Sequence, residues 1–168
     1  MTAASPPMHT ADDDARSSLR IWLRLLTCAS LVEQEVRARL RDRFETTLPR
    51  FDVLAQLDAI AREGRDSLTM GELSHRLMVT NGNLTGIVER LSQERLVSRA
   101  TSPTDRRIQI VRLTAAGKRA LDAMTPEHGR WIEELFAGLT ASERRQLHEL
   151  LGRLRDSLRG ALGEERAP

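Results

Sequence analysis

Asp105, Arg106 and Arg107 are the residues of this chain whose types and spacing most clearly suggest a chemistry. They follow a turn that begins at Ser102, and an alternating apolar segment comes after them. An arginine side chain is long, flat and permanently charged, so it can bind a phosphate or enter the narrow, negative minor groove of DNA. An aspartate two residues earlier can orient the guanidinium. We therefore predict that Arg107 enters a minor groove and Arg106 contacts phosphate, although an isolated Asp-Arg-Arg would indicate only a solvated ion pair.

A second group of residues is small and polar, and it lies just before an apolar stripe that begins at Leu84. Small polar side chains suit the first turns of a helix that enters the major groove, because long or apolar ones would hold it away from the bases. The Asn-Gly-Asn sequence could equally form a turn, but the apolar stripe and the segment behind it favour a helix. The predicted DNA-contacting residues of this helix are Thr80, Asn81, Gly82, Asn83, Thr85, Gly86 and Arg90.

The elements that must position these groups can be predicted from caps and periodicity. Thr69 and Glu72 form a capping box that opens a short helix, and Thr80 can cap a second helix that runs to about Arg95. Two strands at 97–101 and 108–113 complete a β-hairpin. This order predicts a winged helix-turn-helix over residues 48–117, in a protein that is mainly α with a small β-hairpin.

The segment 68–117 resembles the winged helix-turn-helix of the MarR family of bacterial transcription regulators. The resemblance depends on Asp-x-Arg followed by a strand and Leu-Thr-x-x-Gly, here Asp105, Arg107, Leu113, Thr114 and Gly117. It extends over about 15–162 and implies a homodimer that binds a pseudo-palindromic DNA operator, with the recognition helix in the major groove and the wing in the minor groove. It also implies a repressor that a small, often aromatic, ligand releases from DNA.

The flanking segments are predicted to be dimerisation helices, at 15–47 and 118–162. Apolar residues recur at steps of three and four in the first, and Thr140 and Glu143 form a capping box in the second. A single-chain core could absorb these apolar stripes, but the family arrangement pairs them with a partner chain. Residues 1–14 are expected to be a mobile tail, and 163–168 a second tail. The predicted interface residues are Leu19, Leu147, Leu151, Leu154 and Leu158.

A pocket for an aromatic effector would need a flat apolar wall and a cation for a carboxylate. The residues predicted to supply it are Trp22, Cys28, Phe44, Arg50 and Phe51. Core packing is the competing explanation for the aromatic residues among them. Residues 48–57, 68–73 and 78–83 are similar to MarR-type regulators of hydroxycinnamate or related aromatic-acid catabolism, which implies an aromatic acid or its coenzyme A thioester as the ligand.

Other functions find less support in the sequence. The net charge is only +2, so no overall excess of positive charge indicates nucleic acid. The four histidines lack metal-site spacing and no catalytic constellation is found, so we expect no metal, no cofactor and no enzyme activity. Cys28 is the single cysteine, and a buried structural thiol is expected there, with a redox-sensing regulator as an alternative. A helical protein-interaction module that has lost DNA binding is a further alternative. No membrane span is expected, and the predicted location is the cytoplasm.

Overall fold

The computed structural model describes residues 10–102 and 105–162, and the chain divides after His128 into two compact units. The first unit holds the helix-turn-helix and its sheet, and the second holds the last turns of α5 together with α6. Residues 1–9 and 163–168, which belong to the expected tails, and Pro103 and Thr104 of the expected turn lie outside the described residues.

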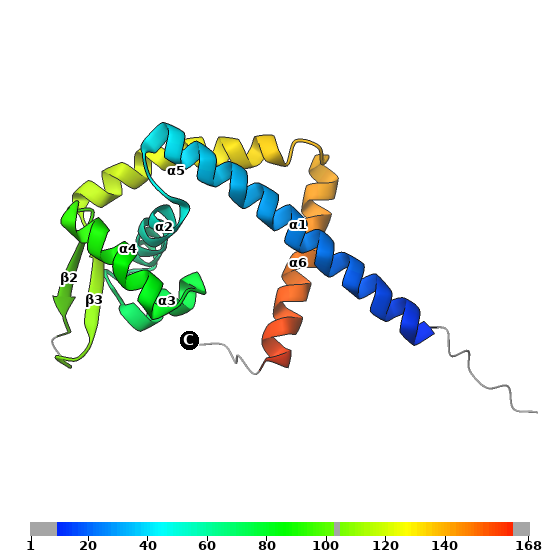
Figure 1. Cartoon of the computed structure of the whole chain (residues 1–168), viewed down its shortest axis with the longest axis horizontal. Coiled ribbons are helices and arrows are strands. Elements are labelled where there is room, and N and C mark those ends of the chain that lie inside the picture. The colour runs from blue at the N-terminus through cyan, green and yellow to red at the C-terminus, as the bar shows by residue number, and fades with distance from the viewer. Residues whose placement is uncertain (1–9, 103–104, 163–168) are drawn as a thin grey trace, which may run out of the picture. The chain divides into compact units, whose positions relative to one another are not determined.

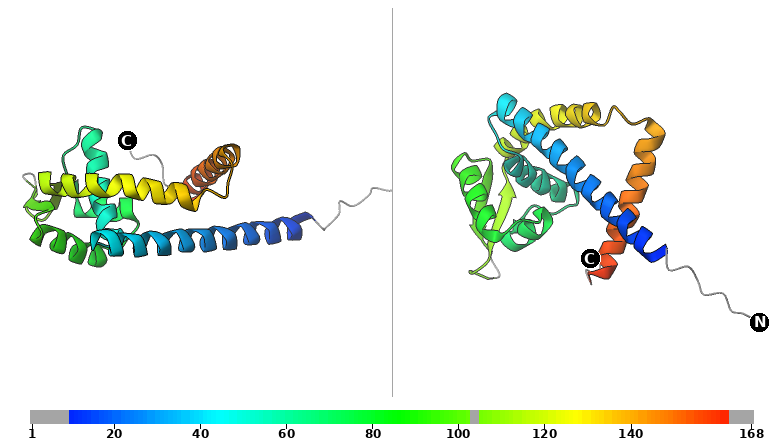
Figure 2. Two further views of the ribbon diagram at one scale, coloured as in Figure 1. Left: turned by 90° about the horizontal axis from the view of Figure 1, so that it is seen from above. Right: turned by 45° about the vertical axis from the view of Figure 1, so that its right-hand side comes forward.

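The first helix, α1, spans Thr10–Phe44 as one unbroken element (Figure 2). It ends at Phe44, three positions before the predicted boundary at residue 47, and begins five positions before Ala15, so residues 10–14 are helical and their assignment to a tail is wrong. From Asp13 to Leu31 its side chains are almost all exposed, and Val36 and Leu40 are the first to be buried. The second half of α1 therefore contributes to the core of the first unit, whereas the first half presents apolar side chains to solvent.

Three shorter helices form the helix-turn-helix region (Figure 1): α2 (Leu48–Arg62), α3 (Met70–Leu77) and α4 (Asn81–Gln93). Proline occupies the first turn of α2, where its missing N–H leaves no partner unsatisfied, and Gly64 ends the segment with a positive φ of 84°. The predicted capping box opens α3, because Thr69 accepts from the Glu72 N–H and the Glu72 carboxylate accepts from the Thr69 N–H. Thr80 caps α4 as predicted.

The sheet has three antiparallel strands in the order β1-β3-β2, with β1 at Leu68–Thr69, β2 at Val97–Thr101 and β3 at Gln109–Leu113. The hairpin of β2 and β3 was predicted, with Val97 opposite Leu113 and Thr101 opposite Gln109. The short β1 was not predicted; it pairs Leu68 with Val111. This pairing attaches the wing to the beginning of α3.

The core of the first unit is built from apolar faces of every element in it. Leu84, Val88 and Leu91 of α4 have no exposed surface, and Leu68, Leu73 and Val111 are equally buried. The last two helices, α5 (Ala115–Leu135) and α6 (Ala141–Ala161), follow the sheet, and the predicted Thr140–Glu143 capping box opens α6. No described residue of α6 is buried, so this helix presents its leucines to solvent.

Candidate nucleic-acid interface

The N-terminal turns of α4 present a continuous polar face. All the residues predicted to contact DNA on this helix are exposed, and the buried side chains lie on its opposite face. The Thr80 hydroxyl accepts from the Asn83 N–H at 3.5 Å, and the Thr85 hydroxyl donates to the Asn81 carbonyl at 2.8 Å. No acidic residue lies in the first turn, so the positive end of the helix dipole is available to phosphate. The amide side chains of Asn81 and Asn83 project from this rigid turn.

The wing orients Arg107 through Asp105. The Asp105 carboxylate accepts from the Arg107 backbone N–H at 2.9 Å, and from its Nε at 3.3 Å and its Nη2 at 3.2 Å. These bonds from Arg107 hold the pKa of Asp105 below its ordinary value, so the pair stays ionised at neutral pH. The Arg107 side chain is 91% exposed. The guanidinium thus has a fixed base and a free outer edge, which is what insertion into a groove requires.

Thr114 and Gly117 attach the wing to the end of α4. The Thr114 N–H donates to the Leu96 carbonyl at 3.1 Å, and the Thr114 hydroxyl lies 2.7 Å from the Arg95 carbonyl oxygen. The same hydroxyl accepts from the Gly117 N–H at 3.0 Å. A Cβ on Gly117 would lie 2.0 Å from the Leu96 carbonyl oxygen, so only glycine fits. The Leu-Thr-x-x-Gly motif is therefore a joint between the wing and the end of α4.

The arginines near this surface fall into two sets. Arg65, Arg76 and Arg112 form ion pairs with Glu72, Glu63 and Asp66, at 2.7, 3.8 and 3.3 Å. Within the described ranges, no carboxylate pairs with four other exposed arginines, which are Arg90 of α4, Arg95 of the turn after it, and Arg99 and Arg106 of the wing. Positive charge is therefore left unneutralised on α4 and the wing, although the chain as a whole carries only +2.

The residues predicted to bind an effector are not brought together in one chain. Trp22 is 54% exposed and Cys28 is exposed, so the expectation of a buried thiol is wrong for the single chain. At ~1.5 Å per residue these two lie roughly 33 and 24 Å along α1 from Phe44. Only Phe44, Arg50 and Phe51 occupy the same junction, between α1 and α2.

That junction is a charged and aromatic cluster that sequence spacing did not reveal. Arg50 forms an ion pair with Glu94 at the end of α4, and the Nε of Arg50 is buried with no hydrogen-bond partner among the described residues. The Phe51 ring stacks on His128 of α5 at a centroid distance of 4.7 Å. Burial holds the pKa of His128 below its ordinary value, so the ring is neutral at pH 7. The cluster links α2 to the end of the recognition helix and to α5.

The only lysine, Lys118, ties the start of α5 to α2. Its Nζ lies 3.1 Å from the buried carboxylate of Asp58 and also bonds Asp122. Burial by itself would raise the pKa of Asp58, but the hydrogen bonds from Lys118 and Arg62 outweigh it and lower that pKa. The sequence offered no signal for this contact, because the partners on α2 and α5 are far apart in the chain.

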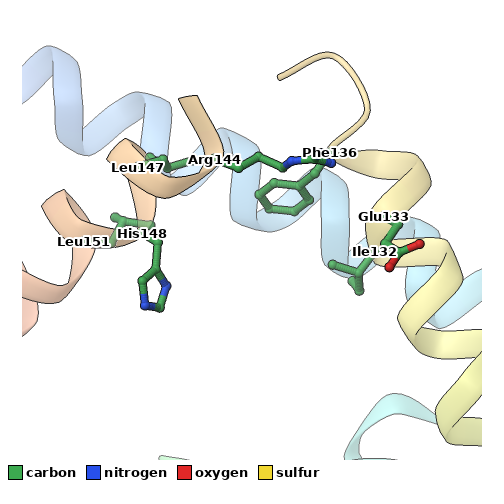
Figure 3. Close-up of a pocket in the computed structure, with 7 residues that line it drawn as sticks. All are labelled: Ile132, Glu133, Phe136, Arg144, Leu147, His148 and Leu151. Atoms are coloured by element: carbon green, nitrogen blue, oxygen red, sulfur yellow. The ribbon is translucent and has the colours of Figure 1, made fainter. Parts of the chain in front are cut away.

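The second unit contains an open pocket between the last turns of α5 and the first turns of α6 (Figure 3). None of the residues predicted to bind an effector lines it, although the predicted interface residues Leu147 and Leu151 do. Leu151, Leu154 and Leu158 are 40–51% exposed, and Leu19 of the first unit is 57% exposed. The residues that line the pocket are Ile132, Glu133, Phe136, Arg144, Leu147, His148 and Leu151.

The part of the chain that the structure describes contains neither a candidate metal site nor a candidate membrane-spanning helix. No group of three or more His, Cys, Asp or Glu side chains in residues 10–102 and 105–162 could hold a metal ion. None of the described helices combines the length and the apolar character that crossing a bilayer requires.

A three-stranded wing attached to a capped recognition helix defines a winged helix-turn-helix DNA-binding protein. A sequence model of the MarR family matches residues 47–108. A helix-turn-helix-type transcriptional regulator of Bacillus cereus is 30% identical over 132 residues, which cover 78% of this chain and 84% of that relative. The regulator YdgJ of Bacillus subtilis is 30% identical over 93 residues, but this chain spans only 57% of its length.

Solved structures show the same fold. Sco3205 of Streptomyces coelicolor, a MarR family regulator crystallised with DNA, aligns with a TM-score of 0.71 at 24% identity over 93% of each chain. A variant of MarR from E. coli bound to operator DNA also gives 0.71 at 24% identity, over 82% of this chain and 95% of that one. The chain belongs to the MarR family, and it is a DNA-binding transcriptional regulator rather than an enzyme.

Proposed function

We propose that this regulator is a homodimeric repressor that binds a pseudo-palindromic operator in the cytoplasm and is released by an aromatic acid or its coenzyme A thioester. The observation that carries the proposal is the exposed polar turn of α4 beside a guanidinium held by Asp105. The first suits a major groove and the second a minor groove. Asn81 and Asn83 then read bases, and Arg106 meets phosphate.

The dimer is supported by apolar surface that the single chain leaves uncovered. Leu19, Trp22 and Leu26 of α1 and Leu154 and Leu158 of α6 are all 40% or more exposed. Several exposed apolar side chains on each of two long helices are unfavourable in water, and burial against a second copy of the chain removes this cost. In a two-fold dimer, two recognition helices reach half-sites roughly 34 Å apart.

The effector is supported most directly by the Arg50 and Phe51 cluster. The aromatic rings of this cluster and the guanidinium of Arg50, with its unpartnered Nε, have the chemistry to bind the ring and the carboxylate of an aromatic acid. Bordetella bronchiseptica BpsR, which has the same fold at a TM-score of 0.65 and 21% identity, is regulated in its DNA binding by 6-hydroxynicotinic acid. Trp22 and Cys28 join such a site only if a partner chain brings them to it. The effector must bind the DNA-free conformation more tightly, because only differential affinity shifts an equilibrium.

Fluorescence anisotropy tests the whole proposal. Labelled duplexes from upstream of the protein's own gene are compared with scrambled duplexes at several salt concentrations, with p-coumarate, p-coumaroyl-coenzyme A or 6-hydroxynicotinic acid added. We expect selective binding that one of these compounds weakens. Selective binding that ignores all of them would remove the aromatic effector, and equal binding to scrambled DNA would favour a protein-interaction module.

The exposure of Cys28 favours one alternative, a redox-sensing regulator. Peroxide should then abolish operator binding by the parent but not by Cys28→Ala. Loss of binding that persists in Cys28→Ala would exclude a role for this thiol.

A further inference from the structure

Met78 occupies an unusual backbone position between α3 and α4. It has φ 53° and ψ 36°, in the left-handed region, and its side chain is 91% exposed. The Met78 N–H donates to the His75 carbonyl and the Val79 N–H to the Ser74 carbonyl, each at 3.2 Å. This is the Schellman pattern of helix ends, in which the left-handed residue is usually glycine. Met78 therefore holds a conformation that its own Cβ disfavours.

The side chain gains nothing inside the fold in return. Among the other methionines that the structure describes, Met124 is 5% exposed and Met70 is partly buried. Glu45 and Arg95 also have positive φ values, but both are polar residues that solvent accommodates. Met78 alone among the described residues combines a left-handed backbone with a large, exposed apolar side chain. Backbone strain that no contact within the protein offsets points to a contact outside it.

Hydrogen bonds on both sides hold the backbone of the turn around Met78. The Ser74 hydroxyl donates to the Val79 carbonyl at 2.6 Å, and Thr80 caps α4 only two residues after Met78. Met78 therefore lies at the N-terminal end of α4, a few residues before the exposed Asn81 and Asn83.

We propose that Met78 makes an apolar contact with operator DNA at the edge of the groove that α4 enters. The inference rests on the proposed placement of α4 in the major groove. Met78 carries no charge for a phosphate, and the apolar groups of DNA within reach of this turn are the thymine methyl and the C–H surface of deoxyribose. A flexible, polarisable thioether fits either surface. The contact adds to operator affinity, and it adds to sequence preference where the partner is thymine.

Three variants separate this role from a structural one. Met78→Gly removes both the strain and the side chain, Met78→Gln keeps the length and the strain but is polar, and Met78→Leu keeps the apolar surface. We expect Met78→Gly to melt about 2–4 °C higher than the parent and yet to bind operator about 5- to 10-fold more weakly. Met78→Gln should bind as weakly without the rise in melting temperature, and Met78→Leu should bind like the parent. The slope of affinity against salt should not change, because no ionic contact is lost.

Replacing single operator thymines with deoxyuridine then identifies the partner surface. A replacement that weakens operator binding by the parent but not by Met78→Gly assigns the contact to the methyl group of that thymine. Weaker binding by Met78→Gly with no sensitive thymine assigns it to deoxyribose, which still supports the proposal. If the parent binds operator selectively and Met78→Gly binds it equally tightly, the proposed contact is overturned, but the proposed function is not. A parent that does not prefer operator to scrambled DNA overturns the proposed function, and the contact with it.

Discussion

The recognition helix α4 and the C-terminal helix α6 are both amphipathic, but they differ in how far their leucine side chains are exposed. Leu84 and Leu91 of α4 have no exposed surface, whereas Leu154 and Leu158 of α6 are 40% and 51% exposed. The face of α4 that solvent reaches is polar, whereas solvent reaches both the polar and the apolar faces of α6. One chain can therefore complete the core beneath α4, while α6 needs a further surface. Each of the following experiments breaks or sharpens this difference.

The largest effect is expected from breaking the joint beneath α4. Gly117→Ala places a Cβ 2.0 Å from the Leu96 carbonyl oxygen, a clash with backbone that cannot move cheaply. We expect the free energy of unfolding to fall by about 3 kcal/mol or more, measured by urea denaturation. Gly129→Ala, in the same helix but with nothing within 4 Å of its added Cβ, is the matched control and should be neutral or stabilising. If Gly117→Ala and Gly129→Ala are equally stable, the role assigned to Gly117 in joining the wing to α4 is wrong.

The proposed dimer is the next feature to test. Leu154→Glu puts a charge on the exposed apolar face of α6, which the single chain tolerates but an apolar interface does not. Sedimentation should show a monomer that keeps its helical circular dichroism. Operator affinity should fall by at least about tenfold, because the two half-sites no longer act together. Ser157→Glu, also exposed on α6, tests for a simple effect of charge. A dimeric Leu154→Glu protein would show that α6 lies outside the interface.

The wing should affect binding without affecting the fold. Arg107→Ala is expected to weaken operator binding by about 1–3 kcal/mol while leaving the melting temperature unchanged, since the side chain is 91% exposed. Asp105→Asn should have a smaller effect, because Arg107 stays charged but loses its orientation. Arg112→Ala, which removes an arginine already paired with Asp66, is the control. If Arg107→Ala binds like the parent, the wing assignment is wrong.

The smallest expected effect lies where α1 meets α2. Burial, followed by the nearby Glu33, raises the pKa of Asp52 to about 6, and Arg37 opposes them. The folded protein then binds more protons than the unfolded chain between about pH 4 and 6. Stability should therefore decrease as the pH rises through this window and level off above it. After allowance for solvent screening the loss is on the order of 1 kcal/mol.

Asp52→Asn should remove this loss. The variant should be more stable than the parent at pH 7.5 and should lose the dependence on pH, as measured by urea denaturation at pH 5 and 7.5. Asp42→Asn, an exposed change near the end of α1, should leave the pH profile unchanged. A parent whose stability is the same at both pH values would contradict the effect of Asp52.

Local sequence signals predicted the parts of this fold that depend on neighbours in the chain. The capping boxes at Thr69 and Thr140, the cap at Thr80 and the pairing of Asp105 with Arg107 each join residues two or three positions apart. Such short patterns are enough to predict the local geometry, because the backbone between the partners has few conformations.

Features that depend on distant partners were not predicted. Arg50 meets Glu94 across 44 positions, and β1 is too short to show a period and forms only because β3 lies beside it. The five residues predicted to form an effector pocket were grouped by character, and the length of α1 separates two of them from the rest. The left-handed turn at Met78 was not predicted, because the left-handed residue at a helix end is usually glycine and here it is methionine.

The bonds that Thr114 makes to the end of α4 also have a mechanical consequence. The recognition helix and the wing are fixed to each other and to the first turn of α5, all within the first unit. A force applied to the first turn of α5 therefore moves α4 and the wing together. A ligand or partner that turns this part of α5 would then change the angle of both elements to a DNA helix without unfolding either of them.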